Sequence, residues 1–268
     1  MAQREFRFGA VAAPDSPGEQ WQDTARRVED LGFSTLLTPD NLRLHHPAAA
    51  LGVAAGATER LRLGTFVLAS PLRTPRAAAW EARSLSVLTD RRFELGLGTG
   101  NAQMREQAAE IGLPYGTGPQ RLRQVEETVE HLRALDGDER TPVLIAAGGP
   151  KARALAGRCA DIVMLAHPPL ATRAEVRAMV DEVRRAAGDR ADRIEFGMTV
   201  FAAGDRVPDW VEGFLGADSA TLAENDSLVL LRGGADELRR RREELGISYF
   251  TAHVNALDAV APLVHQLT

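Results

Sequence analysis

Several features that mark particular classes of protein are absent from this sequence. One cysteine, Cys159, in 268 residues cannot form a disulfide within the chain and suits a reducing compartment. No run of about 18 apolar residues occurs, so no membrane-spanning helix is expected. The first residues, MAQREFRFGAV, lack the apolar core of a signal peptide. We therefore expect a cytoplasmic protein that does not bind membranes.

The sequence also has fewer positively charged than negatively charged residues. Arginine and lysine together number 32 against 37 aspartates and glutamates, the formal net charge is -5, and Lys151 is the only lysine. A protein that binds nucleic acid needs a basic surface to meet the phosphate backbone. This charge balance argues against a general nucleic-acid-binding protein.

The sequence does contain a regular alternation of short apolar runs with longer segments of helical period. Continuous apolar strands between amphipathic helices are typical of a parallel sheet covered by helices. Eight such units in about 250 residues favour a closed (β/α)8 barrel, so we predict an α/β TIM barrel with a single domain over residues 1–268. The predicted strands span residues 6–12, 33–39, 61–69, 92–100, 142–147, 161–166, 194–202 and 248–254.

The helical segments carry ordinary start and stop signals. One apolar stripe at helical spacing ends before Gly32 and consists of Trp21, Ala25, Val28 and Leu31. Farther along the chain, Thr74 followed by Pro75 predicts the start of another helix. Residues 213–234 are polar and contain glycine, and they predict an irregular connection before the last helix, strand and helix.

A glycine turn follows the fifth predicted strand. Gly148 and Gly149 precede Pro150, which suits the first helical position, and Lys151 falls in the first turn, where a cation is disfavoured by roughly 0.3–1 kcal/mol. The free N–H groups of a helix N-terminus attract anions, and glycines allow close approach. A bound phosphate would reverse the penalty on Lys151. The turn therefore fits a phosphate site; alternatively, the glycines only form a tight turn.

Other polar residues follow predicted strands, at the end of the barrel where such folds carry their chemistry. Asp40 and Asn41 end the second strand, where Asp40 would either cap the next helix or hydrogen-bond a ligand ring. His45 and His46 are adjacent and do not share a helix face, so they are a poor pair of metal ligands. His167 follows the sixth strand and is expected on the functional face.

Several catalytic patterns are missing. The stretch GLGTGNA partly matches a dinucleotide-binding motif, but Asn101 stands where the third glycine belongs. No GxSxG motif of a serine hydrolase and no carboxylate–histidine cluster for a metal occurs. Cys159 lies at the end of a predicted helix, and we expect it to be buried and inert. The sequence therefore predicts no metal site.

Four stretches together resemble one family. DLGFSTLLTPDN, LRLGTFVLASPLRTP, SVLTDRRFELGLGTGN and LIAAGGPKARALAGRCADIVM, in this order on the predicted strands, resemble the luciferase-like monooxygenase superfamily and are most similar to its coenzyme F420-dependent oxidoreductases. The resemblance extends from the first strand to the last helix. It implies a (β/α)8 barrel that holds FMN or the deazaflavin F420 at its C-terminal face, and a homodimer formed through the second and third helices.

The resemblance also implies site residues. In F420-dependent members, residues after the second strand contact the deazaflavin ring, and a bulge in the third strand, often with a non-prolyl cis peptide bond, lies behind the ring. Here the bulge corresponds to Phe66–Val67. Carried over to this sequence, the cofactor-binding residues are Asp40, Asn41, Phe66, Val67, Thr99, Gly100, Asn101, Ala147, Gly148, Gly149, Pro150 and Lys151.

Two departures from the family pattern bear on the activity. The F420-dependent sugar-phosphate dehydrogenases that the chain resembles carry a histidine at the position of Asn41 and a glutamate at that of Asn101, and these supply base and acid in that subgroup. Asparagine does not exchange a proton at neutral pH, so we do not expect sugar-phosphate oxidation. Many relatives also insert a segment before the fifth strand, whereas RALDGDERTPVLI runs almost directly into it. The pocket is then more open, or is completed by another subunit.

These observations give a main hypothesis and three alternatives. The main hypothesis is an F420-dependent oxidoreductase that transfers hydride between reduced F420 and a small, conjugated organic substrate, with the ring positioned by Asp40 and Asn41. His45 and His167 are the candidate substrate-site residues, one or the other of which would donate a proton, and no catalytic residue is assigned. The alternatives are an FMN-dependent monooxygenase, a non-catalytic flavin-binding relative, and a barrel that binds a sugar phosphate without a flavin.

Overall fold

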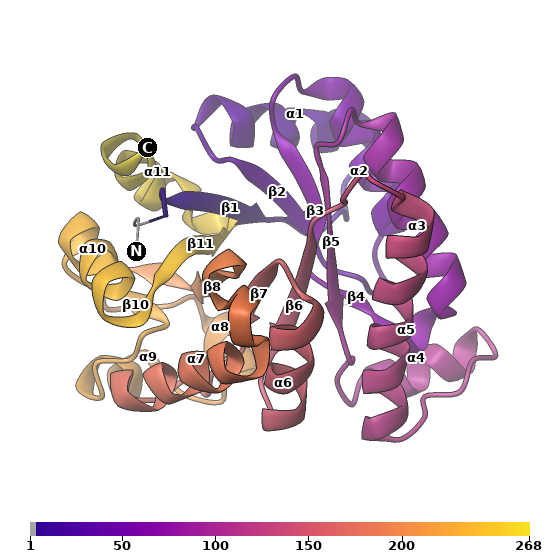
Figure 1. Ribbon diagram of the computed structural model, residues 1–268. Coiled ribbons are helices and arrows are strands. Elements are labelled where there is room, and N and C mark those ends of the chain that lie inside the picture. Colours follow the sequence, from indigo (N-terminus) through magenta and orange to yellow (C-terminus); the bar gives the residue numbers. More distant parts are fainter. Residues whose placement is uncertain (1–3) are drawn as a thin grey trace.

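Strands and helices alternate around a closed barrel in the computed structural model, which describes residues 4–268 (Figure 1). Neighbouring barrel strands pair in parallel, and the last strand pairs with the first. The predicted TIM barrel is confirmed. Residues 1–3 lie outside the described residues. They belong both to the predicted domain, 1–268, and to the N-terminal segment that we considered as a signal peptide. The barrel strands are β1 (Arg7–Val11), β2 (Thr35–Thr38), β3 (Arg62–Thr65), β5 (Phe93–Gly98), β6 (Val143–Ala147), β7 (Ile162–Leu165), β8 (Glu195–Val200) and β11 (Ile247–His253).

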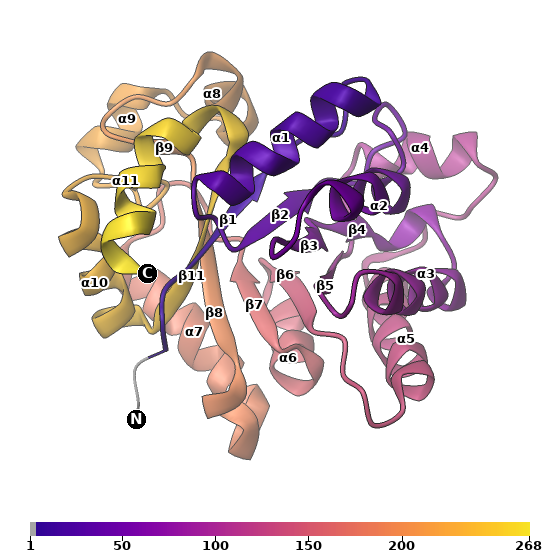
Figure 2. The same cartoon turned by 90° about the horizontal axis from the view of Figure 1, so that it is seen from above.

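Helices cover the outside of the barrel wall (Figure 2). The first helix buries Trp21, Ala25 and Val28, as the apolar stripe predicts, and Thr74 caps the third by accepting a 3.3 Å hydrogen bond from the N–H of Ala77. Over residues 4–268 no helix has both the length and the apolar character that crossing a bilayer requires. The helices around the wall are α1 (Gly18–Asp30), α2 (Pro47–Ala57), α3 (Pro75–Leu88), α5 (Gly118–Asp136), α6 (Pro150–Cys159), α7 (Arg173–Ala187), α10 (Gly234–Leu245) and α11 (Leu257–Leu267). α4 (Met104–Glu110) packs instead on the segment that follows β4 (Leu68–Ala69), in a small cluster with Ala69 and Leu72.

The third predicted strand is divided at Phe66–Val67, whose peptide bond is cis, as predicted. β3 precedes this bond, and a short strand β4 (Leu68–Ala69) continues along β5 after it. Two glycines of β5 face the division. A Cβ on Gly96 would collide with the carbonyl oxygen of Thr65, and one on Gly98 would lie 2.5 Å from Cγ2 of Val67. Gly96 and Gly98 of GLGTGNA therefore serve strand packing, whereas Gly100 lies beyond the strand with a φ of +70°.

The N-terminal end of the barrel interior is charged. Arg7 lies 2.9 Å from a carboxylate oxygen of Glu94 and 2.6 Å from one of Glu195, and its guanidinium stands 4.2 Å from the centre of the Tyr249 ring. The hydroxyl of Tyr249 donates to Glu94 at 3.1 Å. These groups fill the space between the strand starts, so the barrel is open to a ligand from its other end.

The connection predicted to be irregular, residues 213–234, is instead folded, and that prediction is wrong. It contains the end of α8 (Asp209–Leu215), then α9 (Ser219–Glu224) and the strand β10 (Leu230–Leu231), which pairs with β9 (Ala202–Ala203). Asp218 caps α9 by accepting from the N–H of Thr221 at 2.7 Å. Val211 and Leu222 are fully buried in a small apolar cluster of their own, and this burial outweighs the polar composition of the segment.

Candidate functional site

A cavity of about 370 Å³ opens at the C-terminal mouth of the barrel. It brings together Phe66, Val67 and His167, three of the residues predicted from the sequence. No lysine, arginine or carboxylate lines it, so a ligand there meets an almost neutral surface. The lining residues are Phe66, Val67, Ala146, Met164, Leu165, Ala166, His167, Pro169, Thr199, Phe201, Phe214, Leu215 and Val229.

One side of this cavity comes from residues that the sequence patterns do not identify. Phe214 and Leu215 reach it from α8, and the ring of Phe214 lies 5.9 Å from that of Phe201. Phe214 is nevertheless 68% exposed, which is unusual for a phenylalanine in a folded chain. The sequence signal available was an apolar pair, residues 214–215, inside an otherwise polar segment.

The predicted glycine turn lies beside the cavity. α6 begins at Pro150, as predicted, and Gly149 precedes it with ordinary negative φ. A Cβ on Gly148 would lie 3.1 Å from the carbonyl oxygen of Ala166, a cavity residue, whereas one on Gly149 would meet nothing within 4 Å. Packing within the chain therefore explains Gly148 but leaves open space over the helix start at Gly149.

Two cations occupy the first turn of α6 and differ in their partners. Arg153 is buried; its Nε donates to Glu182 at 2.6 Å and its guanidinium donates to the carbonyl of Gly148, which fixes the turn. Lys151 is exposed, and within residues 4–268 its ammonium has no hydrogen-bond or ion-pair partner. The helix start thus offers free N–H groups and one uncommitted positive charge.

Asp40 does not cap the next helix, so that interpretation is wrong. The cap of α2 is His46, whose Nδ1 accepts from the N–H of Ala48. The buried carboxylate of Asp40 instead accepts from the N–H of Ala69 at 2.9 Å and from both terminal nitrogens of Arg73, at 2.6 and 3.2 Å. Asp40 therefore ties the end of β2 to the segment that follows β4, with both its oxygens engaged.

Behind this pair lies a carboxyl group that the sequence does not single out. Glu81 of α3 approaches Arg73 at 3.9 Å and His46 at 3.8 Å, and its Oε1 is buried without a hydrogen-bond partner. Burial raises the pKa of Glu81, against the opposing attraction of Arg73. The group supports the Asp40–Arg73 pair from the side of α3.

The two predicted asparagines form local turns at the same mouth. Asn41 Oδ1 accepts from the N–H of Arg43 at 2.8 Å, and Asn101 Oδ1 accepts from the N–H of Gln103 at 3.1 Å. The loop that contains Thr99, Gly100 and Asn101 is braced by a hydrogen bond from Nε of Arg121 to the carbonyl of Thr99. These residues follow the ends of β2 and β5 but do not line the cavity.

The two predicted substrate histidines are not brought together. His45 is exposed and lines a separate groove with Trp21, between α1 and α2. His167 lines the mouth cavity, and its Nδ1 lies 2.8 Å from the carbonyl oxygen of Pro168. Burial lowers the pKa of His167, so its imidazole is neutral at pH 7. Only His167 is placed to meet a ligand in this cavity.

Neither a metal-binding cluster nor a reactive thiol is found among the described residues. No three side chains of histidine, cysteine, aspartate or glutamate over residues 4–268 are placed to hold a metal ion. Cys159 is half-buried rather than buried, its Sγ donates to the carbonyl of Leu155 at 3.3 Å, and burial raises its pKa to about 11. The thiol therefore stays protonated at neutral pH and has little nucleophilic character.

Comparison with known proteins gives a family and several relatives. The model of the luciferase-like monooxygenase family matches residues 6–212. An F420-dependent glucose-6-phosphate dehydrogenase of Beutenbergia cavernae is 34% identical, with 50% of this chain and 48% of the relative covered. One of Microbacterium testaceum is 28% identical, with 70% and 65% covered. The chain thus spans between about half and two thirds of the length of these two relatives.

Solved structures show the same fold at low identity. The coenzyme F420-dependent tetrahydromethanopterin reductase of Methanopyrus kandleri superposes with a TM-score of 0.74 at 18% identity, covering 99% of this chain and 100% of the reductase. EDTA monooxygenase from Chelativorans gives 0.73 at 13% identity, with 98% and 94% covered. At such identities these matches establish the fold alone.

Proposed function

Because the chain belongs to the luciferase-like monooxygenase family, we propose that it is a coenzyme F420-dependent oxidoreductase that transfers hydride between the reduced deazaflavin and a small organic substrate. The observation that carries the proposal is the contact between the apolar mouth cavity and the start of α6. Ala146 and Ala166 line the cavity, and the carbonyl of Ala166 packs against Gly148 of the turn. A planar ring and a phosphate therefore find complementary surfaces side by side.

Each part of the site has its own task in this proposal. When bound, the deazaflavin supplies the hydride chemistry, and the chain supplies binding and orientation. Phe66 and Val67 back the ring, and the N–H groups at the start of α6 together with Lys151 hold the phosphate. Asp40 keeps the end of β4 in place by accepting from the N–H of Ala69. The apolar cavity wall excludes water from the substrate side.

The cavity also restricts the substrate. A phosphorylated sugar would need a cation, and none lines the cavity, while Asn41 and Asn101 carry amides that do not exchange protons at neutral pH. We infer a neutral, largely apolar or conjugated substrate, in contrast to the glucose 6-phosphate in the names of the relatives. His167, neutral at pH 7, serves as a hydrogen-bonding group toward that substrate.

Lys151→Ala tests the cofactor assignment. Since a charge-assisted hydrogen bond contributes about 1.5–3 kcal/mol, we expect the dissociation constant of F420 to rise roughly tenfold to a hundredfold, with an unchanged melting curve. Gly149→Asp should weaken binding further, because it adds bulk and negative charge in the open space over the helix start. Fluorescence titration with F420 and absorbance titration with FMN measure both affinities.

A matched control lies on the same helix. Arg158 is exposed near the C-terminal end of α6, and Arg158→Ala removes one positive charge without touching the turn. It should leave the affinity for F420 unchanged. Equal titrations for the wild type and Lys151→Ala would refute the role of this lysine, and binding of FMN but not of F420 by the wild type would favour the flavin monooxygenase alternative.

We further propose that the protein is a cytoplasmic homodimer formed through α2 and α3. Three apolar side chains of α3 are exposed on one face: Trp80 is 71%, Val87 49% and Leu88 81% accessible. On α2, Val53 is 40% exposed. Small residues surround it, and a Cβ on Gly52 or on Gly56 would meet nothing within 4 Å, so another chain could approach closely there. The single cysteine supports the cytoplasmic location.

A further inference from the structure

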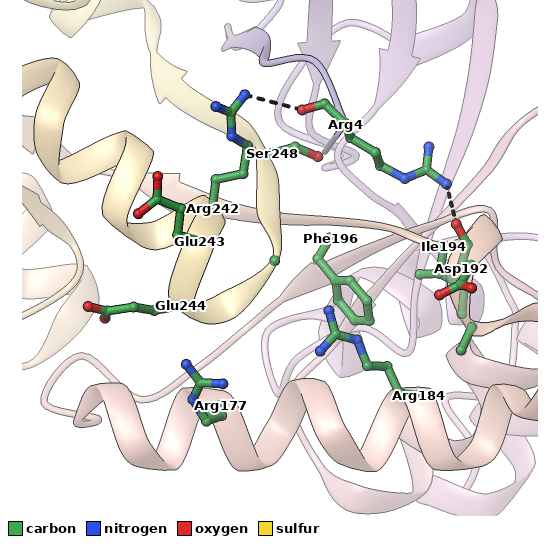
Figure 3. A pocket seen from close by; sticks show the side chains of 12 residues that line it. Arg4, Arg177, Arg184, Asp192, Ile194, Phe196, Arg242, Glu243, Glu244 and Ser248 are labelled. Atoms are coloured by element: carbon green, nitrogen blue, oxygen red, sulfur yellow. Dashed lines mark hydrogen bonds between the residues drawn. The ribbon is translucent and has the colours of Figure 1, made fainter. Parts of the chain in front are cut away.

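A second cavity, of about 480 Å³, lies at the opposite end of the barrel (Figure 3). It is bounded by the starts of β8 and β11, by α7 and α10, and by the segment before β1. Ile194 and Phe196, at the start of β8, line this cavity, whereas Thr199 and Phe201, at or just past the end of β8, line the mouth cavity. This cavity is therefore separated from the mouth cavity by the length of the strands.

Four arginines line this cavity, and they are poorly paired. Within residues 4–268, Arg4, Arg177 and Arg242 have no carboxylate oxygen within 4 Å, and the nearest one to Arg184 is 3.9 Å away, on Asp181. Arg4 and Arg242 instead donate to backbone carbonyls, at 3.1 and 3.3 Å. Ion pairs are closer elsewhere in the chain, as in the 2.6 Å pair of Arg73 and Asp40 and the 2.7 Å pair of Arg241 and Glu237.

Two buried polar atoms of the same lining have no partner in the described chain. The hydroxyl of Ser248 is unpaired although the residue is only 1% exposed, and Nε of Arg242 is likewise buried and unpaired. Buried polar groups in folded proteins are almost always hydrogen-bonded, because leaving them unpaired costs free energy. Both groups can donate to an acceptor placed in the cavity.

The backbone also makes room for one of the guanidiniums. Gly246 has a φ of +74°, which favours glycine, and a Cβ at this position would lie 2.5 Å from Nη2 of Arg184. The three carboxylates of the lining do not cancel the arginines. Glu244 is drawn toward Arg173, 3.5 Å away, while Glu243 and Asp192 are exposed. The cavity therefore keeps a net positive charge.

We propose that this cavity binds a small phosphorylated metabolite, with its phosphate held by Arg184, Arg242 and the hydroxyl of Ser248. Guanidinium groups and a hydroxyl approaching from different elements suit a tetrahedral group with several acceptor oxygens. The cavity is larger than one phosphate, so part of the metabolite beyond the phosphate also lies within it. This site goes beyond the proposed oxidoreductase function and does not depend on it.

Calorimetric titration with inorganic pyrophosphate at constant ionic strength tests the proposal. The wild type should bind it saturably and melt at a higher temperature in its presence. The double variant Arg184→Gln, Arg242→Gln should bind at least about tenfold more weakly, since two charge-assisted contacts are lost. Ser248→Ala should weaken binding to a smaller extent. The matched control is Arg185→Gln, an exposed arginine of α7 that does not line the cavity, and it should bind as the wild type does.

The outcomes separate this proposal from the oxidoreductase one. Lys151→Ala should leave pyrophosphate binding unchanged, and the double variant should leave F420 binding unchanged. If the double variant does not fold, Arg177→Gln, at an exposed position, should still weaken pyrophosphate binding. The proposal is overturned if the wild type shows no saturable binding, or if the double variant binds pyrophosphate as tightly as Arg185→Gln does. Tighter binding of citrate than of pyrophosphate would overturn the choice of phosphate.

Discussion

Arg7 is the residue on which the charged end of the barrel interior depends. It is the nearest cation to two carboxylates from different strands, Glu94, whose side chain is 1% exposed, and Glu195, at 9%. Arg62 reaches Glu94 only at 3.6 Å. Buried carboxylates are tolerated when they are paired and become costly when the partner is removed. The sequence alone gives no sign of this cluster, because its members are 87 and 188 residues apart.

Arg7→Met should therefore destabilise the protein strongly. The substitution keeps an apolar side chain of similar length but leaves Glu94 and Glu195 without the positive charge of Arg7. We therefore expect the free energy of unfolding at pH 7, measured by urea denaturation, to fall by about 3–5 kcal/mol. The control is Arg26→Met on α1, where both members of the pair with Asp23 are largely exposed. Its effect should stay within about 0.5 kcal/mol.

The loss caused by Arg7→Met should shrink as the pH falls. Burial raises the pKa of Glu195 even with Arg7 beside it, and removing Arg7 should raise it further. Between the pKa values of the unfolded and folded states, the folded variant then binds a proton that the unfolded chain does not. Its stability consequently rises as the pH falls through the folded-state pKa. Equal losses at pH 7 and pH 5 would contradict this account.

Among the elements, α8 is the one whose most exposed aromatic side chain, Phe214, is explained by the proposed ligand. Trp210 and Phe214 are 46% and 68% exposed, and the ring of Trp210 stands 4.7 Å from that of His253. Val211 of the same helix is fully buried and attaches α8 to its small apolar cluster. The helix therefore presents the ring of Phe214 to the mouth cavity, while its own attachment depends on Val211.

Phe214→Ala should separate ligand binding from stability. Since the ring is mostly exposed, the free energy of unfolding should change by less than about 0.5 kcal/mol. Binding of F420 or of an apolar substrate should weaken by roughly tenfold to a hundredfold, because burying an aromatic side chain is worth about 1.5–3 kcal/mol. Phe214→Leu, which keeps an apolar surface, should recover most of the affinity. Unchanged binding by Phe214→Ala would mean that α8 does not cover the ligand.

At the scale of elements, the sequence predicts what is local and misses what depends on packing between distant segments. The strand-to-helix turn at Gly148–Pro150 and the cap at Thr74 follow from neighbouring residues, and both are found. The cis bond at Phe66–Val67 was accessible through the family resemblance rather than through propensity. α8 and α9 were missed because the burial of Val211 and Leu222 depends on a cluster that no local pattern specifies.

For the whole molecule, the barrel could be predicted because eight repeats of one strand-and-helix pattern leave little choice of topology. The arrangement of the site could be predicted only in part. The order of the strands predicts that Asp40 and Lys151 lie at the same mouth of the barrel. Which side chains contact them depends on tertiary packing, as in the pair of Asp40 with Arg73, and could not be predicted. For the same reason two histidines that were both predicted at this mouth are separated: His45 lines the groove between α1 and α2, and His167 lines the mouth cavity.

The proposed homodimer gives the last prediction. Val87 and Leu88 follow Trp80 by seven and eight residues on α3, the spacing of an apolar stripe along one side of a helix. A monomer would expose this stripe to water. Light scattering should therefore give about twice the chain mass of 29.0 kDa. Trp80→Glu with Leu88→Glu should give the single chain mass, because charges at the centre of an apolar interface are left without partners. Leu135→Glu, an exposed leucine of α5, is the control and should remain dimeric. A monomeric wild type would contradict the assembly while leaving both ligand sites, each contained in one chain, open to test.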